Sequence, residues 1–412
     1  MTSPLSCRFC HQELTRTFVD LGSTPLANSY LRQESHIAAE KSYPLHARVC
    51  ETCFLVQVED VVPAEDIFSD YAYFSSFSSS WVEHARRYAE KLSSELNLGP
   101  DSLVAEIASN DGYLLKHFVA KGIPVLGIEP AANVAKSAEK VGVRTEVAFF
   151  GIETATRLAK SGLQADLMAA NNVMAHVPDI NDFIGGIPIL LGKDGVFTIE
   201  FPHLLNLIEK VQFDTIYHEH YSYLSLLTVE KILEAHGLKL FDVEELPTHG
   251  GSLRVYACHE GAGKYAETPR LGALRKKETA AGLDTVSAYQ NFTPRVEKVR
   301  DDLLSFLQAA KAEGKKVAGY GAAAKGNTLL NYCGVGPDLI EFVVDRNPEK
   351  QGTLLPGSHI PVFSPEKIWA EKPDYVLILP WNLADEISSD MAAVKDWGGR
   401  FVIPIPELEI LS

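Results

Sequence analysis

Residues 217–223, with the sequence YHEHYSY, bring two histidines, a glutamate and three tyrosines together within seven positions. A histidine near its reference pKa of about 6.5 can remove a proton at neutral pH, and a neighbouring carboxylate can orient it. A tyrosine can donate a hydrogen bond to a developing oxyanion. A metal site is the alternative, but the segment lacks the histidine spacing of HExxH. The pattern favours acid–base chemistry, with chance crowding of polar residues as the remaining alternative.

Four of the six cysteines form two CxxC pairs, CRFC at residues 7–10 and CETC at residues 50–53. Each CxxC turn lets two sulfurs reach the same ion, and four thiolates fill the tetrahedral shell of zinc. No coordination position then stays open for a substrate. We therefore predict a structural zinc site formed by Cys7, Cys10, Cys50 and Cys53. Cys258 and Cys333 stand alone and are expected to be packed thiols.

A glycine-rich loop with a lysine, GYGAAAKGN, follows a predicted strand at residues 317–320 and opens a helix. Backbone N–H groups and the Lys325 ammonium at such a position suit a diphosphate. The spacing is not that of a Walker A loop. The loop therefore belongs to a second, smaller Rossmann-like unit. This unit is either a degenerate dinucleotide-binding fold or a docking site for a nucleotide substrate.

The other chemical groups depend on residues 104–130, which we predict to form a strand, a turn, a helix and a second strand. The turn holds one glycine and an aspartate rather than GxGxxG, and Glu129 closes the second strand. This favours S-adenosylmethionine over NAD, because the turn suits a carboxylate or ribose better than a pyrophosphate. Any parallel α/β unit is the alternative.

Further strands are predicted at 144–150, 166–172 and 195–201, with helices between them. A helix at 229–237 and an antiparallel hairpin at 239–244 and 252–259 are predicted to follow. Ligands in such sheets sit at the carboxyl ends of the strands. The polar residues expected at these ends are Ser109, Asn110, Asp111, Glu129, Asn171, Asn172, His176, Glu200 and His203. The diglycine after His249 predicts either a tight turn or a close approach of the backbone to a ligand.

The composition limits the classes of function. A chain of 412 residues predicts two or three domains, and its net charge of −16 makes it a poor binder of nucleic acid or anionic membranes. We find no membrane-spanning apolar run and no signal peptide, so we expect a cytoplasmic protein. The aromatic and serine-rich residues 70–80 look more like a solvated linker than a sugar-contacting segment.

The motifs, taken together, are familiar. Two CxxC pairs, LGSTPLANSYL, DYAYFSS, EIASNDGYLL, NNVMAHVPD, YHEHYSYLS, HGGSLRVY and GYGAAAKGNTLLN occur in this order. They resemble the nucleotide-sugar C-methyltransferases of deoxysugar biosynthesis, the sugar 3-C-methyltransferase family, over nearly the whole chain. The resemblance implies an α/β fold in three parts: a zinc-binding and sugar-contacting module (1–82), a central class I methyltransferase Rossmann-like domain that binds S-adenosylmethionine (83–310), and a smaller Rossmann-like α/β domain that binds the nucleotide sugar (311–412).

The resemblance also implies roles for single residues. For the methyl donor it points to Ser109, Asn110, Asp111, Gly112, Asn171 and Asn172, with Glu129 on the ribose. For the acceptor it points to His220 as the base, with Tyr217 and Glu219 beside it, His176 on the sugar side, and Tyr73 rather than Tyr71 near the sugar. Ser75, Ser76, Gly321, Lys325 and Asn327 would contact the nucleotide sugar. His218 fills a variable position of the motif.

The implied substrate is a dTDP-4-keto-6-deoxy or 2,6-dideoxy hexose, methylated at C3′. His220 would remove the C3′ proton, and Tyr217 or His176 would stabilise charge on the C4′ oxygen. The alternatives are a methyltransferase acting on another ketone or a sugar hydroxyl, an NAD-dependent sugar-nucleotide oxidoreductase, and a zinc-bearing binding protein without activity. A monomer is compatible with this plan, because three domains already supply a closed site.

Overall fold

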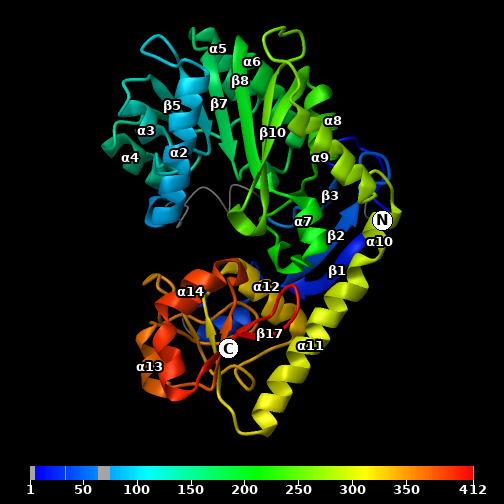
Figure 1. Ribbon diagram of the computed structural model, residues 1–412, viewed down its shortest axis with the longest axis vertical. Coiled ribbons are helices and arrows are strands. Elements are labelled where there is room, and N and C mark those ends of the chain that lie inside the picture. The colour runs from blue at the N-terminus through cyan, green and yellow to red at the C-terminus, as the bar shows by residue number, and fades with distance from the viewer. Residues whose placement is uncertain (1–4, 33, 64–74, 412) are drawn as a thin grey trace.

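The structure is a computed structural model that describes residues 5–32, 34–63 and 75–411. The described chain forms three sheets joined by helices, which confirms the predicted α/β class. Figure 1 shows the central and C-terminal sheets at opposite ends of the molecule, with strands β1 and β2 and helix α11 beside them. Among the described residues, no helix is both long enough and apolar enough to cross a membrane.

The N-terminal sheet has four antiparallel strands in the order β1-β2-β3-β9. Its members are β1 (Arg16–Thr24), β2 (Tyr43–Val49), β3 (Val56–Gln57) and β9 (Ser222–Tyr223), and helix η1 (Glu34–Ala39) precedes β2. Strand β9 comes from residues that follow His220 almost directly. The sheet of the cysteine-rich module therefore holds the end of the YHEHYSY segment in place.

The central sheet has the order β10-β11-β8-β7-β4-β5-β6, parallel from β8 to β6. Its strands are β4 (Val104–Ile107), β5 (Val125–Ile128), β6 (Thr145–Glu146), β7 (Ala165–Asn171), β8 (Leu191–Pro202), β10 (Leu238–Leu246) and β11 (Ser252–His259). The predicted antiparallel hairpin is confirmed as β10 and β11. The chain reverses its direction of sheet growth between β4 and β7, so ligands are expected at the carboxyl ends of these two strands.

Two predicted boundaries in this region were wrong. Strand β6 covers two residues rather than seven, and the chain turns into helix α5, where Thr154 Oγ1 donates to the Phe149 carbonyl oxygen at 2.8 Å. Helix α8 begins at Leu226 instead of Val229, because the Ser225 side chain accepts a hydrogen bond from Thr228 N and so caps the helix.

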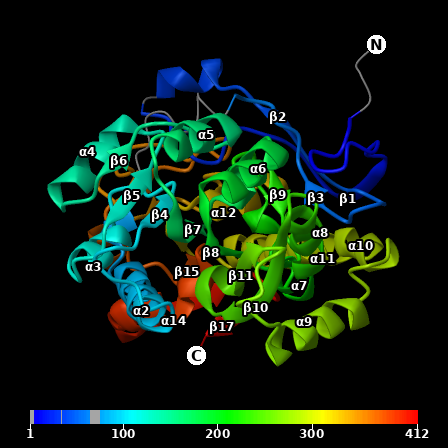
Figure 2. The ribbon, with the colours of Figure 1, turned by 90° about the horizontal axis from the view of Figure 1, so that it is seen from above.

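Helices cover both faces of the central sheet (Figure 2). The helices between residues 79 and 312 are α2 (Ser79–Glu95), α3 (Leu115–Val119), α4 (Ala132–Lys140), α5 (Ile152–Lys160), η3 (Met174–His176), α6 (Ile180–Leu190), α7 (Leu204–Glu209), η4 (Phe213–Thr215), α8 (Leu226–Glu234), η5 (Thr248–Gly250), α9 (Pro269–Ala280), α10 (Ser287–Gln290) and α11 (Phe292–Ala312). The last two, α10 and α11, pack beside β1 instead. Helix α2 buries Ala85, Tyr88, Ala89 and Leu92, which recur at helical spacing. That face packs the helix beside β4 and brings its N-terminus to the carboxyl edge of the sheet.

The C-terminal sheet has the order β14-β13-β12-β15-β16-β17, and only β17 runs antiparallel. Its elements are β12 (Val317–Tyr320), α12 (Ala324–Cys333), β13 (Val343–Val344), β14 (Val362–Phe363), α13 (Glu366–Glu371), β15 (Tyr375–Ile378), η6 (Trp381–Leu383), α14 (Ala384–Asp390), η7 (Ala392–Trp397), β16 (Arg400–Ile403) and β17 (Glu409–Leu411). The glycine-rich loop joins β12 to α12 as predicted. The switch in strand order falls between β12 and β15, beside this loop.

Candidate active site and zinc centre

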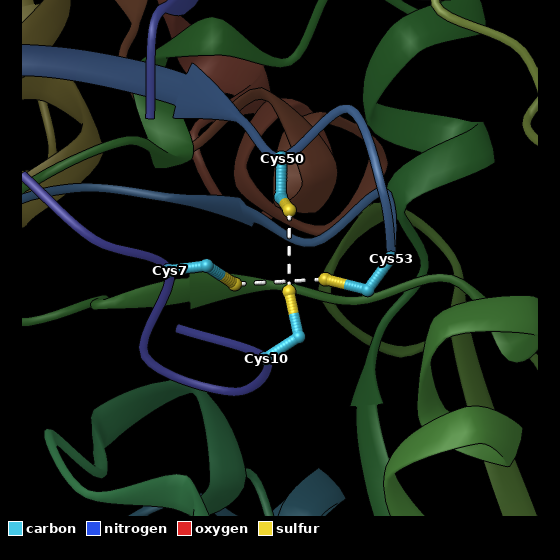
Figure 3. Close-up of side chains that lie close together, drawn as sticks. All are labelled: Cys7, Cys10, Cys50 and Cys53. Atoms are coloured by element: carbon cyan, nitrogen blue, oxygen red, sulfur yellow. Dashed lines mark hydrogen bonds between the residues drawn. The ribbon is translucent and has the colours of Figure 1, made fainter. Parts of the chain in front are cut away.

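The four cysteines of the two CxxC pairs converge, with their sulfur atoms all within 4.8 Å of one another (Figure 3). Cys7 Sγ lies 3.5 Å from Cys53 Sγ, and Cys10 Sγ lies 3.4 Å from Cys50 Sγ. Four sulfurs at Zn–S distances of about 2.3 Å lie about 3.8 Å apart at the corners of a tetrahedron. The donor set and its spacing therefore fit one zinc ion.

The two cysteine turns have the same backbone geometry. His11 N donates to the Cys7 carbonyl oxygen at 2.9 Å, and Phe54 N donates to the Cys50 carbonyl oxygen at 3.0 Å. His11 and Phe54 both have a left-handed φ, 61° and 65°, which closes each turn. Strand β3 begins soon after the second turn and pairs with β9. The zinc centre thus supports the sheet that holds the YHEHYSY segment, without lying among its reactive groups.

The predicted donor loop lies at the carboxyl end of β4. Asn110 and Gly112 have φ values of 49° and 80°, and Ser109 is buried. Glu129 ends β5, and its carboxylate accepts hydrogen bonds from Asn110 N and Ala131 N, each at 2.9 Å. The loop and the acidic residue are therefore one connected unit.

Three buried carboxylates gather at this edge: Glu106 within β4, Asp111 in the loop, and Glu129. Burial raises the pKa of Glu106 well above its usual value, and the charges of Glu129 and Asp111 raise it further. Glu106 also interacts with the hydroxyl of Tyr113, which interacts in turn with Asn171. A cluster of acidic groups fits a ligand that is positively charged and carries ribose hydroxyls, as S-adenosylmethionine does. Glu106 and Tyr113 were not predicted as site residues, although a carboxylate inside an apolar strand was a visible signal.

Ser75 and Ser76, which were predicted to contact the sugar, form hydrogen bonds with the donor loop. Ser75 N donates to Asn110 Oδ1 at 2.9 Å, and Ser76 N donates to Asp111 Oδ2 at 3.2 Å. The Ser76 hydroxyl donates to the same carboxylate oxygen. The segment before α2 is thereby fastened to the donor side of the site. Tyr73 lies outside the described residues.

Two histidines meet at the predicted catalytic position. The His220 ring packs edge-on against the His176 ring, with 4.6 Å between centroids. His220 Nδ1 lies 3.0 Å from the Thr215 carbonyl oxygen, which can only accept, so Nδ1 carries the proton. His220 Nε2 then accepts from the Tyr217 hydroxyl at 2.8 Å. Burial lowers the pKa of His220 well below its usual value, and the charges of His176, His249 and Lys325 add to the effect.

The neighbours of His220 in the motif face other elements. His176 Nδ1 donates to the Glu219 carbonyl oxygen at 2.7 Å, and burial lowers the pKa of His176 to about 4. The Glu219 carboxylate accepts from Asn28 Nδ2 at 2.8 and 2.9 Å, so Thr215 and Tyr217, rather than Glu219, orient the His220 ring. His218 Nε2 donates to the Pro44 carbonyl oxygen at 3.1 Å, which fastens this histidine to β2.

The C-terminal loop brings Lys325 to the same place. Lys325 Nζ donates to Asn382 Oδ1 at 2.7 Å and lies 4.6 Å above the Trp381 ring. Trp381 Nε1 donates to Asp214 Oδ2 at 2.7 Å. Asp214 precedes Tyr217 by three residues. Burial lowers the pKa of Lys325 and raises that of Asp214 to about 6. Trp381 lies shortly after the end of β15. This position at a strand end was a signal by which the sequence could have indicated Trp381 as a site residue.

The other two residues predicted in this loop make packing contacts, Gly321 within the C-terminal domain and Asn327 with the N-terminal module. Gly321 has a φ of 93°, and a Cβ atom there would lie 2.4 Å from Pro380 Cδ. Asn327 is buried, and its Nδ2 donates to the Ala27 carbonyl oxygen at 2.6 Å. Asn327 therefore joins α12 to the N-terminal module.

The sequence did not predict that the polar residues around Glu200 form one buried network. Glu200 lies near the end of β8 with no exposed surface, and its carboxylate accepts from Arg254 Nη2 at 2.7 Å and Thr248 Oγ1 at 3.0 Å. His84 Nε2 lies 2.9 Å from the same carboxylate. His203, also expected at a strand end, is instead buried against Glu278 at 2.7 Å, and Glu278 accepts from Leu226 N at the start of α8. His203 therefore supports the fold away from the site.

Comparison with known proteins follows the same division of the chain. Three family models match it: "Putative zinc binding domain" over residues 7–68, "Methyltransferase domain" over residues 81–243, and "C-methyltransferase C-terminal domain" over residues 247–406. The C-methyltransferase NovU of Streptomyces niveus is 37% identical over 406 residues, which cover 98% of this chain and 96% of that protein.

Solved structures match the chain more distantly. An S-adenosylmethionine-dependent methyltransferase of Clostridium acetobutylicum is 13% identical, with 44% of this chain and 92% of that chain covered and a TM-score of 0.36. The magnesium protoporphyrin IX methyltransferase of Synechocystis, with bound S-adenosylmethionine, is 14% identical, with 49% and 100% covered and a TM-score of 0.36.

The whole-length match to NovU and the three family models carry the assignment. The acidic edge of the central sheet and the four converging cysteines fit its cofactors, S-adenosylmethionine and zinc. The chain belongs to the C-methyltransferase family and is an S-adenosylmethionine-dependent C-methyltransferase with an N-terminal zinc-binding domain.

Proposed function

We propose that this enzyme methylates C3′ of a nucleotide-linked 4-keto sugar, a dTDP-4-keto-6-deoxy or 2,6-dideoxy hexose, after forming its enolate. The observation that carries the proposal is the pair formed by His220 and Tyr217. A neutral imidazole with its accepting nitrogen on a tyrosine hydroxyl is a base beside a proton donor. A C–H group next to a ketone needs both, because its carbanion is stable only as an enolate.

His220 is the proposed base. The Thr215 carbonyl oxygen fixes the tautomer in which Nε2 has a lone pair, and the lowered pKa keeps the ring neutral at physiological pH. His176 also stays neutral at physiological pH, because burial lowers its pKa to about 4. A general base contributes about 10²–10⁴-fold to the rate.

Tyr217 is the better placed of the two groups considered for the C4′ oxygen. The Nδ1 proton of His176 is donated to the Glu219 carbonyl oxygen, so a neutral His176 has no second N–H to offer. The Tyr217 hydroxyl needs only to change its acceptor from His220 Nε2 to the ketone oxygen. That change also exposes the lone pair of the base to the C3′ proton. The enolate oxygen keeps this hydrogen bond while the carbon acts as the nucleophile.

The donor side supplies the other reactant. When bound, S-adenosylmethionine provides an electrophilic methyl group on a positively charged sulfur. We assign its ribose to Glu129 and the remaining contacts to Ser109, Asn110, Asp111, Gly112, Asn171 and Asn172. Asn171 is the last residue of β7 and Asn172 follows it, at the switch in strand order and shortly before His176. This position lets the donor meet the enolate, and alignment of the two supplies much of the remaining acceleration.

The anionic part of the acceptor belongs on the C-terminal domain. Lys325 lies at the first turn of α12, and its charge acts on His220. A diphosphate held there would leave the sugar between Lys325 and the two histidines. We assign Ser75 and Ser76 to the neighbouring wall, where both already contact the donor loop. Tyr73 stays a proposed contact of the sugar.

The test is a methylation assay with S-adenosylmethionine and dTDP-4-keto-6-deoxyglucose, with fragmentation of the product by mass spectrometry. We expect one added methyl group, attached to C3′. A methyl group on a hydroxyl oxygen would contradict the enolate mechanism and favour the sugar hydroxyl alternative. UDP- and CDP-linked forms of the same sugar test the choice of nucleotide.

A further inference from the structure

The turn between β10 and β11 contains three successive residues with positive φ: His249 at 54°, Gly250 at 86° and Gly251 at 121°. A positive φ is uncommon for a residue other than glycine, although histidine tolerates it better than most, and strained backbone of this kind concentrates at functional sites. A Cβ atom at Gly250 would lie 2.6 Å from the Trp381 ring, and one at Gly251 would lie 2.4 Å from Asn206 Nδ2. The backbone is thus held between two domains in a conformation that few sequences permit.

Hydrogen bonds hold the turn from both sides of the histidine. Thr248 Oγ1 donates to the buried Glu200 carboxylate at 3.0 Å, and Gln212 Nε2 donates to the Gly250 carbonyl oxygen at 2.9 Å. The His249 side chain itself is exposed. A strained and anchored turn that presents an accessible imidazole indicates that the imidazole has a ligand.

The groups that face His249 show what kind of ligand this is. Its Nε2 accepts from Asn172 Nδ2 at 3.4 Å, and its ring lies 5.4 Å from the Trp81 ring. The charged groups acting on it are Lys325 from α12, Glu200 from β8 and His84 from α2. Glu200 is already paired with Arg254 and His84, so its charge is largely balanced.

Lys325 supplies a permanent positive charge at this place, and the neighbouring histidines can add to it only by taking up protons. His249 also acts on His176 and His220, and Lys325 acts on both His220 and His249. Asp214, the carboxylate facing Lys325, is itself engaged by Trp381 Nε1. Trp381 lies under Lys325 and against Gly250, so one indole ring joins the lysine to the histidine turn.

We propose that His249 takes up a proton from solvent when substrate binds and forms, together with Lys325, the cationic site for the substrate's diphosphate. The identity of that anion rests on the proposed function. The ring is accessible, yet the surrounding atoms desolvate it and, with Lys325, lower the pKa of His249 to about 4 in the ligand-free protein. A bound anion raises the pKa of His249 again, because a nearby negative charge favours the protonated ring.

The test is calorimetry of the full-length enzyme with inorganic pyrophosphate at pH 7, in buffers of different ionisation enthalpy. The variants are His249→Gln and Lys325→Met, and His36→Gln is a matched control at an exposed position of η1. We expect about a tenfold weaker Kd in His249→Gln, equivalent to about 1.4 kcal/mol. We also expect the number of protons taken up on binding to fall by close to one relative to wild type and the control.

Unchanged affinity and proton uptake in His249→Gln would overturn the proposal. Far-UV circular dichroism and the thermal unfolding midpoint report whether each variant is folded. A His249→Gln enzyme with unchanged KM but reduced kcat for the nucleotide sugar would also overturn it, because the histidine would then act at the reacting atoms. Pyrophosphate binding that depends on His249, in an enzyme that fails to methylate 4-keto sugars, would support this inference while contradicting the proposed function.

Discussion

The central and C-terminal sheets are built on the same plan, but the groups at their switch points have opposite charge. The edge of the central sheet gathers the carboxylates Glu106, Asp111 and Glu129. The C-terminal loop brings Lys325 toward a group of histidines, His176, His220 and His249. Both ends follow the same rule for strand order, so the fold fixes where ligands bind and the side chains decide which charge they carry.

This contrast matches the two reactants of the proposed reaction. The methyl donor is a cation at sulfur, and a nucleotide sugar is an anion at its diphosphate. Opposite fields on the two sides keep each reactant from the other's position, since a like charge would cost free energy there. The histidines next to the reacting carbon stay neutral, which leaves them available as bases.

The largest expected effect is on the acceptor side. His220→Asn should lower kcat by at least about a hundredfold, because it removes the proposed base. The Kd for S-adenosylmethionine should stay within a factor of two to three of wild type. Steady-state kinetics and calorimetry measure the two quantities, with His36→Asn as a control. Turnover like that of the wild type would refute the base assignment.

Loss of zinc tests whether the acceptor side can be impaired without affecting donor binding. Cys10→Ser should lower kcat by roughly tenfold or more, because the zinc-binding domain supports β3 and through it β9, next to His220. Donor affinity should change little, since the donor loop belongs to the central sheet. Zinc content by atomic emission and donor binding by calorimetry measure both effects. Cys258→Ser is the control, and equal loss on both sides would argue against this separation.

A smaller effect is expected on the donor side. Asp111→Asn should weaken S-adenosylmethionine about tenfold, near 1.4 kcal/mol, and should weaken the uncharged product S-adenosylhomocysteine less. The difference follows if the acidic cluster recognises the charge on sulfur. Calorimetric titration with both ligands measures it. An equal loss for both would show that Asp111 contributes hydrogen bonding without charge recognition.

The smallest expected effect is on the titration of one histidine rather than on activity. His176 should titrate near pH 4 in the ligand-free enzyme, well below the usual value for histidine. Because the folded-state pKa is lowered, the unfolded chain binds more protons between about pH 6.5 and 4, and stability falls as pH drops through this window. NMR of histidine-labelled protein measures the midpoint, with His176→Gln identifying the signal. A midpoint near 6.5 would contradict the desolvated environment of the ring.

The sequence predicted those features that depend on local pattern. The two CxxC pairs specify their own turns, and the apolar runs of β4, β5 and β12 are bounded by turn residues. The site residues found by motif came from strand ends, where the fold places ligands. His220 and Lys325, 105 positions apart, could be assigned separately, but their mutual influence could not be predicted from spacing.

The features that were missed depend on contacts between distant segments. Ser76 reaches Asp111 because helix α2 packs beside β4, and Trp381 reaches Asp214 across two domains. The Glu219 side chain turns to Asn28 in the N-terminal module. No local periodicity encodes these choices, because each depends on how the three domains meet. The early start of α8 is set by the Ser225 cap, and the Thr154 hydroxyl bond to Phe149 accompanies the turn after the short strand β6.

His220 is proposed to form an enolate at C3′ of a nucleotide-linked 4-keto sugar. The most direct measurement is hydrogen exchange at C3′ of dTDP-4-keto-6-deoxyglucose in deuterated water, followed by mass spectrometry, without the methyl donor. The wild-type enzyme should introduce deuterium at C3′, and His220→Asn should do so at least about a hundredfold more slowly. Absence of both exchange and methylation in wild-type enzyme that binds S-adenosylmethionine would contradict the 4-keto sugar assignment.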